Sequence, residues 1–189
     1  MSPMFAASPP GISRPQVKYD YPIVAEGRAR RGSSGGFALP ENMSADKKRI
    51  VVTHSPAETR RLAAELLLQL RPGAVLALHG DLGAGKTCFV QGLAAALGVH
   101  QPVSSPPFTL IHEYASTPPL YHADLYRIRN ADDACGLGLE EYLGGDGITV
   151  IEWAERAGEL LPADTWHLTF EVGKDMTERI ITIARGAAT

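Results

Sequence analysis

Residues 80–87 read GDLGAGKT and match the phosphate-binding pattern G-x-x-x-x-G-K-[ST] at every fixed position. The glycines let the backbone curl until several N–H groups point inward, and with the N-terminus of a following helix these groups bind phosphate oxygens. Lys86 adds a positive charge for the β- and γ-phosphates, and the Thr87 hydroxyl can ligate Mg²⁺. The motif, a P-loop, therefore predicts a site for a nucleoside triphosphate and Mg²⁺.

The residues on either side of the P-loop supply the strand and the helix that it requires. Residues 74–78 form a short apolar run, which is typical of a buried parallel strand. A helix is expected from about Lys86, ending near the glycine cap Gly98. Its apolar residues recur at helical spacing: Phe89, Val90, Leu93, Ala94 and Leu97. The alternative, a glycine-rich turn that binds nothing, would leave Lys86 without a purpose.

The nucleotide site is predicted to extend through the whole motif and one residue beyond it. Its expected contacts are Gly80, Asp81, Leu82, Gly83, Ala84, Gly85, Lys86, Thr87 and Cys88.

The first part of the chain differs in composition from the rest. Residues 1–48 are rich in Pro, Gly, Ser and Arg and show no sustained apolar periodicity, so we expect a disordered N-terminal extension. Met43 lies just before the first predicted strand, and translation starting there is a second explanation. Residues 49–189 are then one P-loop ATPase domain of ordinary size.

Charge is divided unequally along the chain. Residues 1–49 hold 8 Lys and Arg against 4 Asp and Glu, which leaves 10 against 17 and a net charge of about −7 in the remainder. A domain that binds nucleic acid unaided usually has a basic face, so direct RNA or DNA binding is not expected. No apolar run approaches the roughly 18 residues that span a bilayer. Two cysteines without paired spacing indicate neither a zinc site nor a disulfide framework, and we expect a cytoplasmic protein.

The order of predicted elements indicates a three-layer α/β fold with a central, mostly parallel sheet. A strand at residues 50–52 is followed by a helix from the capping box 55–58 to about Leu70, and then by the P-loop strand and helix. Further strands are predicted at residues 108–114, 120–124 and 148–151, with a short helical stretch at 131–143. Residues 166–172 and 180–183 predict a C-terminal β-hairpin.

Two acidic residues could complete the site, because hydrolysis needs a carboxylate that holds the metal's water shell or orients the attacking water. Glu152 follows the strand 148–151, and Asp124 closes the strand 120–124. In a parallel sheet both emerge at the carboxyl edge, where ligands bind. His122 and Asp124 share one face of a strand and could alternatively bind a transition metal. Arg127 and Arg129 are either phosphate clamps or exposed charges.

Four segments in this order resemble the TsaE family of small bacterial P-loop ATPases. They are GDLGAGKT, then VSSPPFTL at residues 103–110, HADLYR at 122–127 and VIEW at 150–153, and the resemblance covers about residues 50–185.

The resemblance implies a role in making N6-threonylcarbamoyladenosine at position 37 of tRNAs that read ANN codons. The family's ATPase works there with the proteins TsaB and TsaD, so tRNA is reached only through that assembly. It implies ATP and Mg²⁺ as ligands, with Lys86 and Thr87 serving phosphate and metal, and Asp124 and Glu152 serving metal and water activation. Ser105 would belong to a switch-like loop, and Trp153 would lie at the functional face.

The chain departs from the family pattern at two positions. Cys88 replaces a second threonine that follows the P-loop threonine, and Pro107 replaces the threonine of a Ser-Pro-Thr triplet. A thiol is a weak donor, and proline lacks an N–H, so contacts to the nucleotide are lost or left to the backbone. Because Cys88 is near a helix N-terminus and beside Lys86, a lowered thiol pKa and fast alkylation, slowed by ATP, are predicted.

Other functions of a P-loop protein are the main alternatives. A small-molecule kinase uses the same motif and sheet but usually needs an arginine-rich lid, and the arginines here are scattered. A GTPase would need an N-K-x-D motif, which the sequence lacks. A non-catalytic module that holds ATP as a structural ligand is the third possibility; it would tolerate Glu152→Gln, whereas an ATPase would not.

Overall fold

The computed structural model describes residues 48–186 except 106–110, 130–132, 135 and 137. By its contacts the chain divides into Met1–Gly32 and Ser33–Thr189, and every described residue belongs to the second unit. The predicted extension 1–48, apart from Lys48, and the alternative start at Met43 lie outside the described residues. Within them, no helix is both long and apolar enough to cross a membrane.

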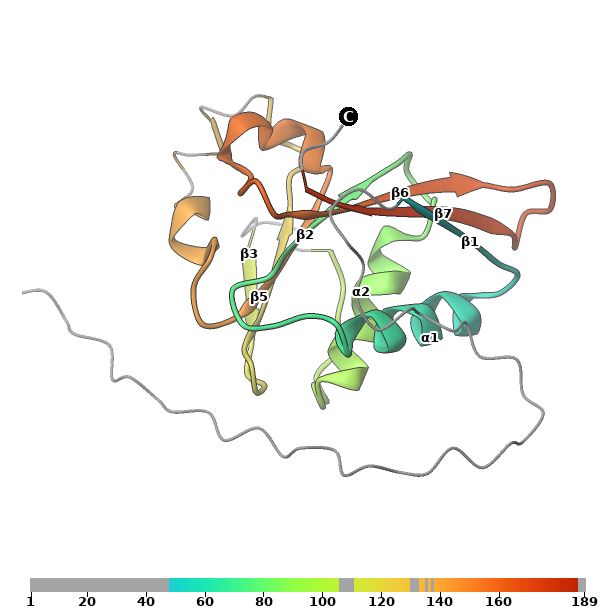
Figure 1. Cartoon of the computed structure of the whole chain (residues 1–189), viewed down its shortest axis with the longest axis horizontal. Coiled ribbons are helices and arrows are strands. Elements are labelled where there is room, and N and C mark those ends of the chain that lie inside the picture. Colours follow the sequence, from blue (N-terminus) through green and yellow to red (C-terminus); the bar gives the residue numbers. More distant parts are fainter. Residues whose placement is uncertain (1–47, 106–110, 130–132, 135, 137, 187–189) are drawn as a thin grey trace, which may run out of the picture. The chain divides into compact units, whose positions relative to one another are not determined.

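One seven-stranded sheet, in the order β1-β7-β6-β2-β5-β4-β3, organises the domain. The strand that leads into the P-loop, β2, lies in the middle of this order (Figure 1). The strands are β1 (Arg49–Thr53), β2 (Val75–His79), β3 (Ile111–Tyr114), β4 (Leu120–Asp124), β5 (Ile148–Glu152), β6 (Trp166–Val172) and β7 (Arg179–Arg185).

The centre of the sheet is parallel and its flanks are antiparallel. β2 pairs in parallel with β5 and β6, and β5 pairs in parallel with β4. The outer pairs β3–β4, β6–β7 and β1–β7 are antiparallel, and in the last of these Arg49 lies opposite Ile183. The predicted α/β class with a parallel sheet core and a C-terminal hairpin is confirmed.

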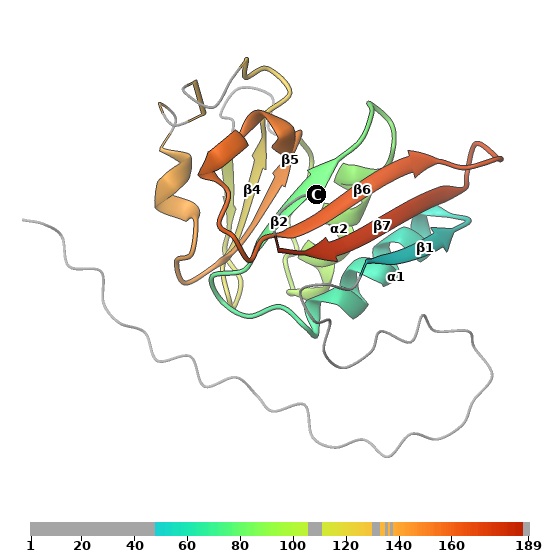
Figure 2. The same cartoon turned by 45° about the horizontal axis from the view of Figure 1, so that its top comes forward.

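Two helices, α1 (Pro56–Leu67) and α2 (Lys86–Ala96), cover one face of the sheet. Figure 2 shows them behind β6, β7 and β1. They pack closely enough that a Cβ on Gly92 of α2 would clash with the backbone of Arg60 in α1. Ser55 caps α1 as predicted, because its Oγ accepts a hydrogen bond from the Glu58 N–H at 3.2 Å.

The alternation of side chains along the strands produces two cores, one on each face. Leu76 and Leu78 of β2 pack toward the two helices, whereas Val75 and Ala77 pack on the opposite face. That second core is completed by the three 3-10 segments, which are η1 (Leu139–Tyr142), η2 (Ala154–Arg156) and η3 (Gly158–Leu160). The sheet therefore lies between two layers, as expected.

Most strand ends lie within two residues of their predicted positions, and helix α1 and the stretch 131–143 differ more. Helix α1 ends at Leu67 instead of Leu70. The backbone N–H groups of Gln69 and Leu70 then donate to the carbonyls three residues earlier, which forms a 3-10-like turn before Pro72. Strand β3 (Ile111–Tyr114) lies within the predicted strand 108–114, and the first three residues of that prediction lie outside the described residues. In the predicted helical stretch 131–143, where several residues are also outside, the described residues 139–142 form a 3-10 turn.

Candidate functional site: the P-loop pocket

The P-loop connects β2 to α2, and its glycines are required by geometry. Gly80 has φ +128, and a Cβ there would clash with the carbonyl oxygen of Phe170 in β6. Gly85 has φ +105 and directly precedes α2, in the left-handed region that favours glycine. The loop closes through a 3.1 Å bond from the Ala84 N–H to the Asp81 carbonyl. The N-terminus of an eleven-residue helix thus opens at the carboxyl edge of the sheet.

Lys86 lies folded across this loop. Its Nζ donates to the carbonyl oxygens of Gly80 at 2.5 Å and Asp81 at 2.9 Å, and it lies 4.1 Å from the centroid of the Trp153 ring. Burial lowers the pKa of Lys86, and nearby carboxylates, first that of Glu152, act in the opposite direction. The site thus holds a cation on a flexible stem beside the helix N-terminus.

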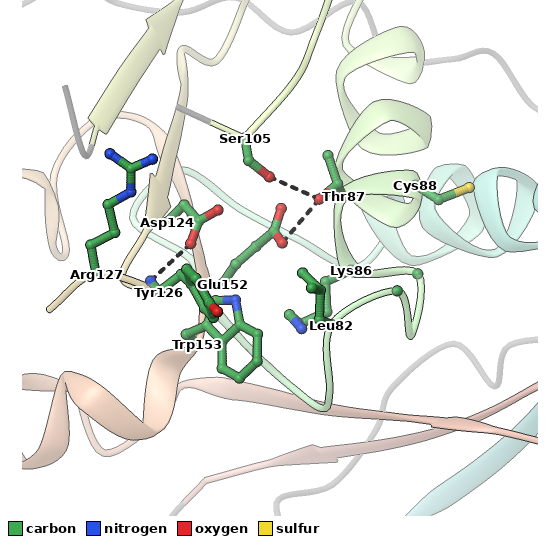
Figure 3. A pocket seen from close by; sticks show the side chains of 12 residues that line it. Leu82, Lys86, Thr87, Cys88, Ser105, Asp124, Tyr126, Arg127, Glu152 and Trp153 are labelled. Carbon is green, nitrogen blue, oxygen red and sulfur yellow. Dashed lines mark hydrogen bonds between the residues drawn. The ribbon is translucent and has the colours of Figure 1, made fainter. Parts of the chain in front are cut away.

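The two acidic residues lie side by side at the ends of neighbouring strands. Asp124 of β4 and Glu152 of β5 are register partners, and both are buried. Glu152 Oε2 accepts a 3.0 Å bond from Thr87 Oγ1, which also lies 3.1 Å from Ser105 Oγ. Asp124 Oδ1 accepts from the Tyr126 N–H at 2.9 Å. Three segments far apart in sequence thus meet around the Thr87 hydroxyl (Figure 3).

Aromatic residues form the wall opposite the helix. Trp153 has φ +57, and among the described residues it is the one non-glycine with positive φ. Such a conformation is strained for a bulky residue and is commonest at functional sites. Its ring lies 5.0 Å from that of Tyr126, and the Arg156 guanidinium lies 5.7 Å from the Trp153 centroid. Arg156 also donates to the carbonyls of Leu125, Tyr126 and Ile128, which fixes the chain after β4.

These residues enclose a pocket of about 360 Å³, large enough for a small ligand. Its lining comprises Leu82, Gly83, Gly85, Lys86, Thr87, Cys88, Ser105, Asp124, Tyr126, Arg127, Glu152 and Trp153. Gly80, Asp81 and Ala84 belong to the loop but do not line the pocket.

Two alternatives from the sequence remain: a transition-metal site at His122 and Asp124, and a phosphate-binding role for Arg127 and Arg129. His122 Nε2 lies 3.0 Å from Glu152 Oε1, and the described residues contain no cluster of three His, Cys, Asp or Glu side chains that could hold a metal ion. Arg127 and Arg129 are both exposed. Arg127 lines the pocket, whereas Arg129 pairs with Asp133 at 3.5 Å.

The prediction of a lowered pKa for Cys88 is wrong. Burial raises the pKa of this thiol, and the positive charges of Arg60 and Arg179 offset the effect only in part. The Sγ donates to the Pro56 carbonyl of α1 at 3.5 Å. The cost of burying a thiolate therefore exceeds the stabilisation that the sequence position suggested.

Arg179 is the residue of this site that the sequence did not indicate. It begins β7, and its Nε donates to the Ala84 carbonyl at 2.9 Å while its Nη2 donates to the Gly83 carbonyl at 3.1 Å. These bonds tie two P-loop carbonyls to the hairpin. No local pattern could have revealed this contact, because 95 residues separate the two partners.

A P-loop between a central parallel strand and its helix, with carboxylates at the ends of two neighbouring parallel strands, defines the P-loop NTPase-like class of α/β proteins. The family model of the threonylcarbamoyl adenosine biosynthesis protein TsaE matches residues 53–181. The chain belongs to the TsaE family.

Individual relatives agree with this assignment. The chain is 44% identical over 131 residues to the Bacillus subtilis tRNA threonylcarbamoyladenosine biosynthesis protein TsaE, covering 69% of this chain and 81% of the relative. It is 41% identical to the Treponema pallidum protein of the same name, covering 70% of this chain and 98% of the relative. The crystal structure of Bacillus subtilis YdiB superposes with a TM-score of 0.64 at 38% identity, covering 75% of this chain and 87% of that one.

Proposed function

We propose that this protein binds ATP with Mg²⁺ in the P-loop pocket and hydrolyses it in support of N6-threonylcarbamoyladenosine formation at position 37 of tRNAs that read ANN codons. The relatives from Bacillus subtilis and Treponema pallidum are named for tRNA threonylcarbamoyladenosine biosynthesis, without a position in the tRNA. The observation that carries the catalytic part is the 3.0 Å bond from Thr87 Oγ1 to Glu152 Oε2, which places a buried carboxylate beside the P-loop threonine.

In this proposal the positively charged groups bind phosphate and the carboxylates serve the metal and the attacking water. The N–H groups at the start of α2 and the Lys86 ammonium bind the phosphate oxygens, and Lys86 exchanges its two carbonyl partners for them. Asp124 and Glu152 would hold the water shell of the metal and orient the attacking water. Trp153 and Tyr126 limit access of bulk water from the opposite wall.

The donor set fits Mg²⁺. Thr87, Asp124 and Glu152 offer hydroxyl and carboxylate oxygens, which are the ligands that this hard cation prefers. The ion would neutralise charge that develops on the phosphate oxygens.

Partner proteins follow from the family and from charge. Residues 50–189 carry 10 Lys and Arg against 17 Asp and Glu, so the domain itself is poorly suited to tRNA. We propose that it acts in the cytoplasm on an assembly of TsaB and TsaD and reaches tRNA only through them. Its ATP cycle would drive or reset that assembly.

The test is the amount of threonylcarbamoyladenosine in tRNA from cells depleted of this protein, measured by mass spectrometry. Wild type should restore the nucleoside, whereas Lys86→Ala and Glu152→Gln should not, at equal protein levels. Lys174→Ala, which changes an exposed lysine of the hairpin turn, is the matched control and should restore it. Unchanged nucleoside after depletion, in cells with no second copy of the protein, rejects the proposal.

A further inference from the structure

One histidine lies buried directly behind the proposed catalytic acid. His122 is in β4, its side chain is fully buried, and its Nε2 is 3.0 Å from Glu152 Oε1. The other oxygen of the same carboxylate, Oε2, is bound by Thr87 at 3.0 Å. Glu152 is thus held at both oxygens, by α2 on one side and by β4 on the other.

The chemistry of the carboxylate defines the tautomer of the histidine. An ionised carboxylate only accepts hydrogen bonds, so the proton of this bond is on Nε2. Nδ1 is buried and has no hydrogen-bond partner within the described part of the chain. A neutral ring with its lone pair on Nδ1 leaves one unsatisfied acceptor, whereas a proton on Nδ1 would leave a buried donor without an acceptor. The arrangement therefore favours the Nε2–H tautomer.

We infer that His122 is a positioning residue for ATP hydrolysis, which holds Glu152 Oε1 so that Oε2 alone faces Thr87 and the nucleotide. The inference rests on the proposed function. A glutamate side chain has three rotatable bonds, and Lys86 attracts this one, since Glu152 has the largest effect of the carboxylates that raise the pKa of Lys86. Without the His122 bond, the carboxylate would lose its fixed orientation.

The first test does not depend on turnover. The ¹⁵N chemical shifts of the His122 ring in the wild-type protein should show a protonated Nε2 and an unprotonated Nδ1. Glu152→Gln should shift the Nε2 signal, because the charged acceptor is lost. A ring protonated at Nδ1 alone overturns the inference, whatever the protein hydrolyses.

The second test is a mutant cycle on ATP hydrolysis in the presence of TsaB and TsaD. His122→Leu should lower kcat by about 10- to 100-fold with KM changed little, the usual effect of losing a partner of a ligating carboxylate. His122→Gln should recover most of kcat, because its amide nitrogen can take the place of Nε2. In a Glu152→Gln background His122→Leu should have little further effect.

His112→Leu provides the matched control. His112 lies opposite His122 on β3, but its Nδ1 lies near the Tyr114 hydroxyl and it makes no bond to Glu152. It should leave kcat unchanged. The inference would be overturned if His122→Leu lowered kcat by the same factor in the wild-type and the Glu152→Gln backgrounds. An effect of His122→Leu on KM alone would overturn it too. If His122→Leu does not fold, His122→Gln and the ¹⁵N shifts decide the matter, whereas a wild type without hydrolysis refutes only the proposed function.

Discussion

Lys86 combines two properties that usually exclude each other: it is charged and it is almost fully buried, with 4% of its surface exposed. Two main-chain carbonyls and the face of Trp153 replace the water that the ammonium would otherwise bind. The replacement is incomplete, since burial still lowers the pKa of Lys86. An anionic phosphate oxygen would therefore be a stronger partner for the ammonium than these neutral groups.

The affinity for ATP should depend on pH through this lysine. Because its pKa is lowered, Lys86 loses its charge at a lower pH than an exposed lysine does. ATP binding should weaken by about 10- to 100-fold as pH rises through that range, the worth of one hydrogen bond from a charged donor. Calorimetric titrations between neutral and strongly alkaline pH measure this.

Lys86→Arg is the control for that titration, because a guanidinium keeps its proton throughout the range. Its affinity for ATP should stay level. A wild-type affinity that does not fall at alkaline pH would refute the role of Lys86 in phosphate binding.

Cys88 should react slowly. Since burial raises its thiol pKa, alkylation by iodoacetamide at neutral pH should be slower than that of a free cysteine, and the rate should rise with pH beyond the ordinary thiol range. Bound ATP should slow the reaction further, because Cys88 is one of the residues that line the pocket. Rates are measured by mass spectrometry on a Cys135→Ala background. A rate that has already levelled off at neutral pH would show a lowered pKa after all.

The β6–β7 hairpin supports the P-loop from the side, and this support depends on one residue. Arg179→Ala removes bonds to Gly83 and Ala84, so the loop should lose its shape and ATP affinity should fall by about tenfold, the loss of roughly 1.4 kcal/mol. The free energy of unfolding should fall by about 1–2 kcal/mol. Both are measured directly, by nucleotide titration and urea unfolding.

Arg185→Ala is the matched control, since Arg185 is on the same strand and its ion-pair partner is the exposed Asp164, at 3.6 Å. It should leave ATP affinity unchanged. Equal losses in the two variants would mean that the strand, and not the contact to the P-loop, is responsible.

Local sequence determines the central elements well and tertiary contacts poorly. The apolar run before the P-loop, the Ser55 cap and the hairpin were predictable, because each depends on neighbouring residues. The parallel strands predicted that Asp124 and Glu152 emerge at one edge of the sheet, and the structure adds that the two residues are register partners on neighbouring strands. The Arg179 contact and the partial burial of Cys88 could not be predicted, since both depend on segments distant in sequence.

The whole domain should not bind tRNA unaided. Positions 50–189 hold 17 acidic and 10 basic residues, and this negative net charge opposes the phosphate contacts that give nucleic-acid affinity. Filter binding of residues 43–189 to tRNA at physiological salt should show a Kd weaker than about 10⁻⁴ M, the upper limit of ordinary non-specific binding. Adding TsaB and TsaD should produce a tRNA complex that contains the protein. Tight, salt-dependent binding by the isolated domain would contradict this.

The pairing of Arg49 with Ile183 joins the first strand of the domain to the last. β1 runs in the same direction as β6 and β2, so the start of β1 and the end of β7 both lie at the edge opposite the P-loop. A fluorescent protein or affinity tag attached at either end of the domain would therefore not obstruct the P-loop pocket. A short peptide could also connect the two ends, which makes this fold a candidate for circular permutation with new termini in the 173–178 turn.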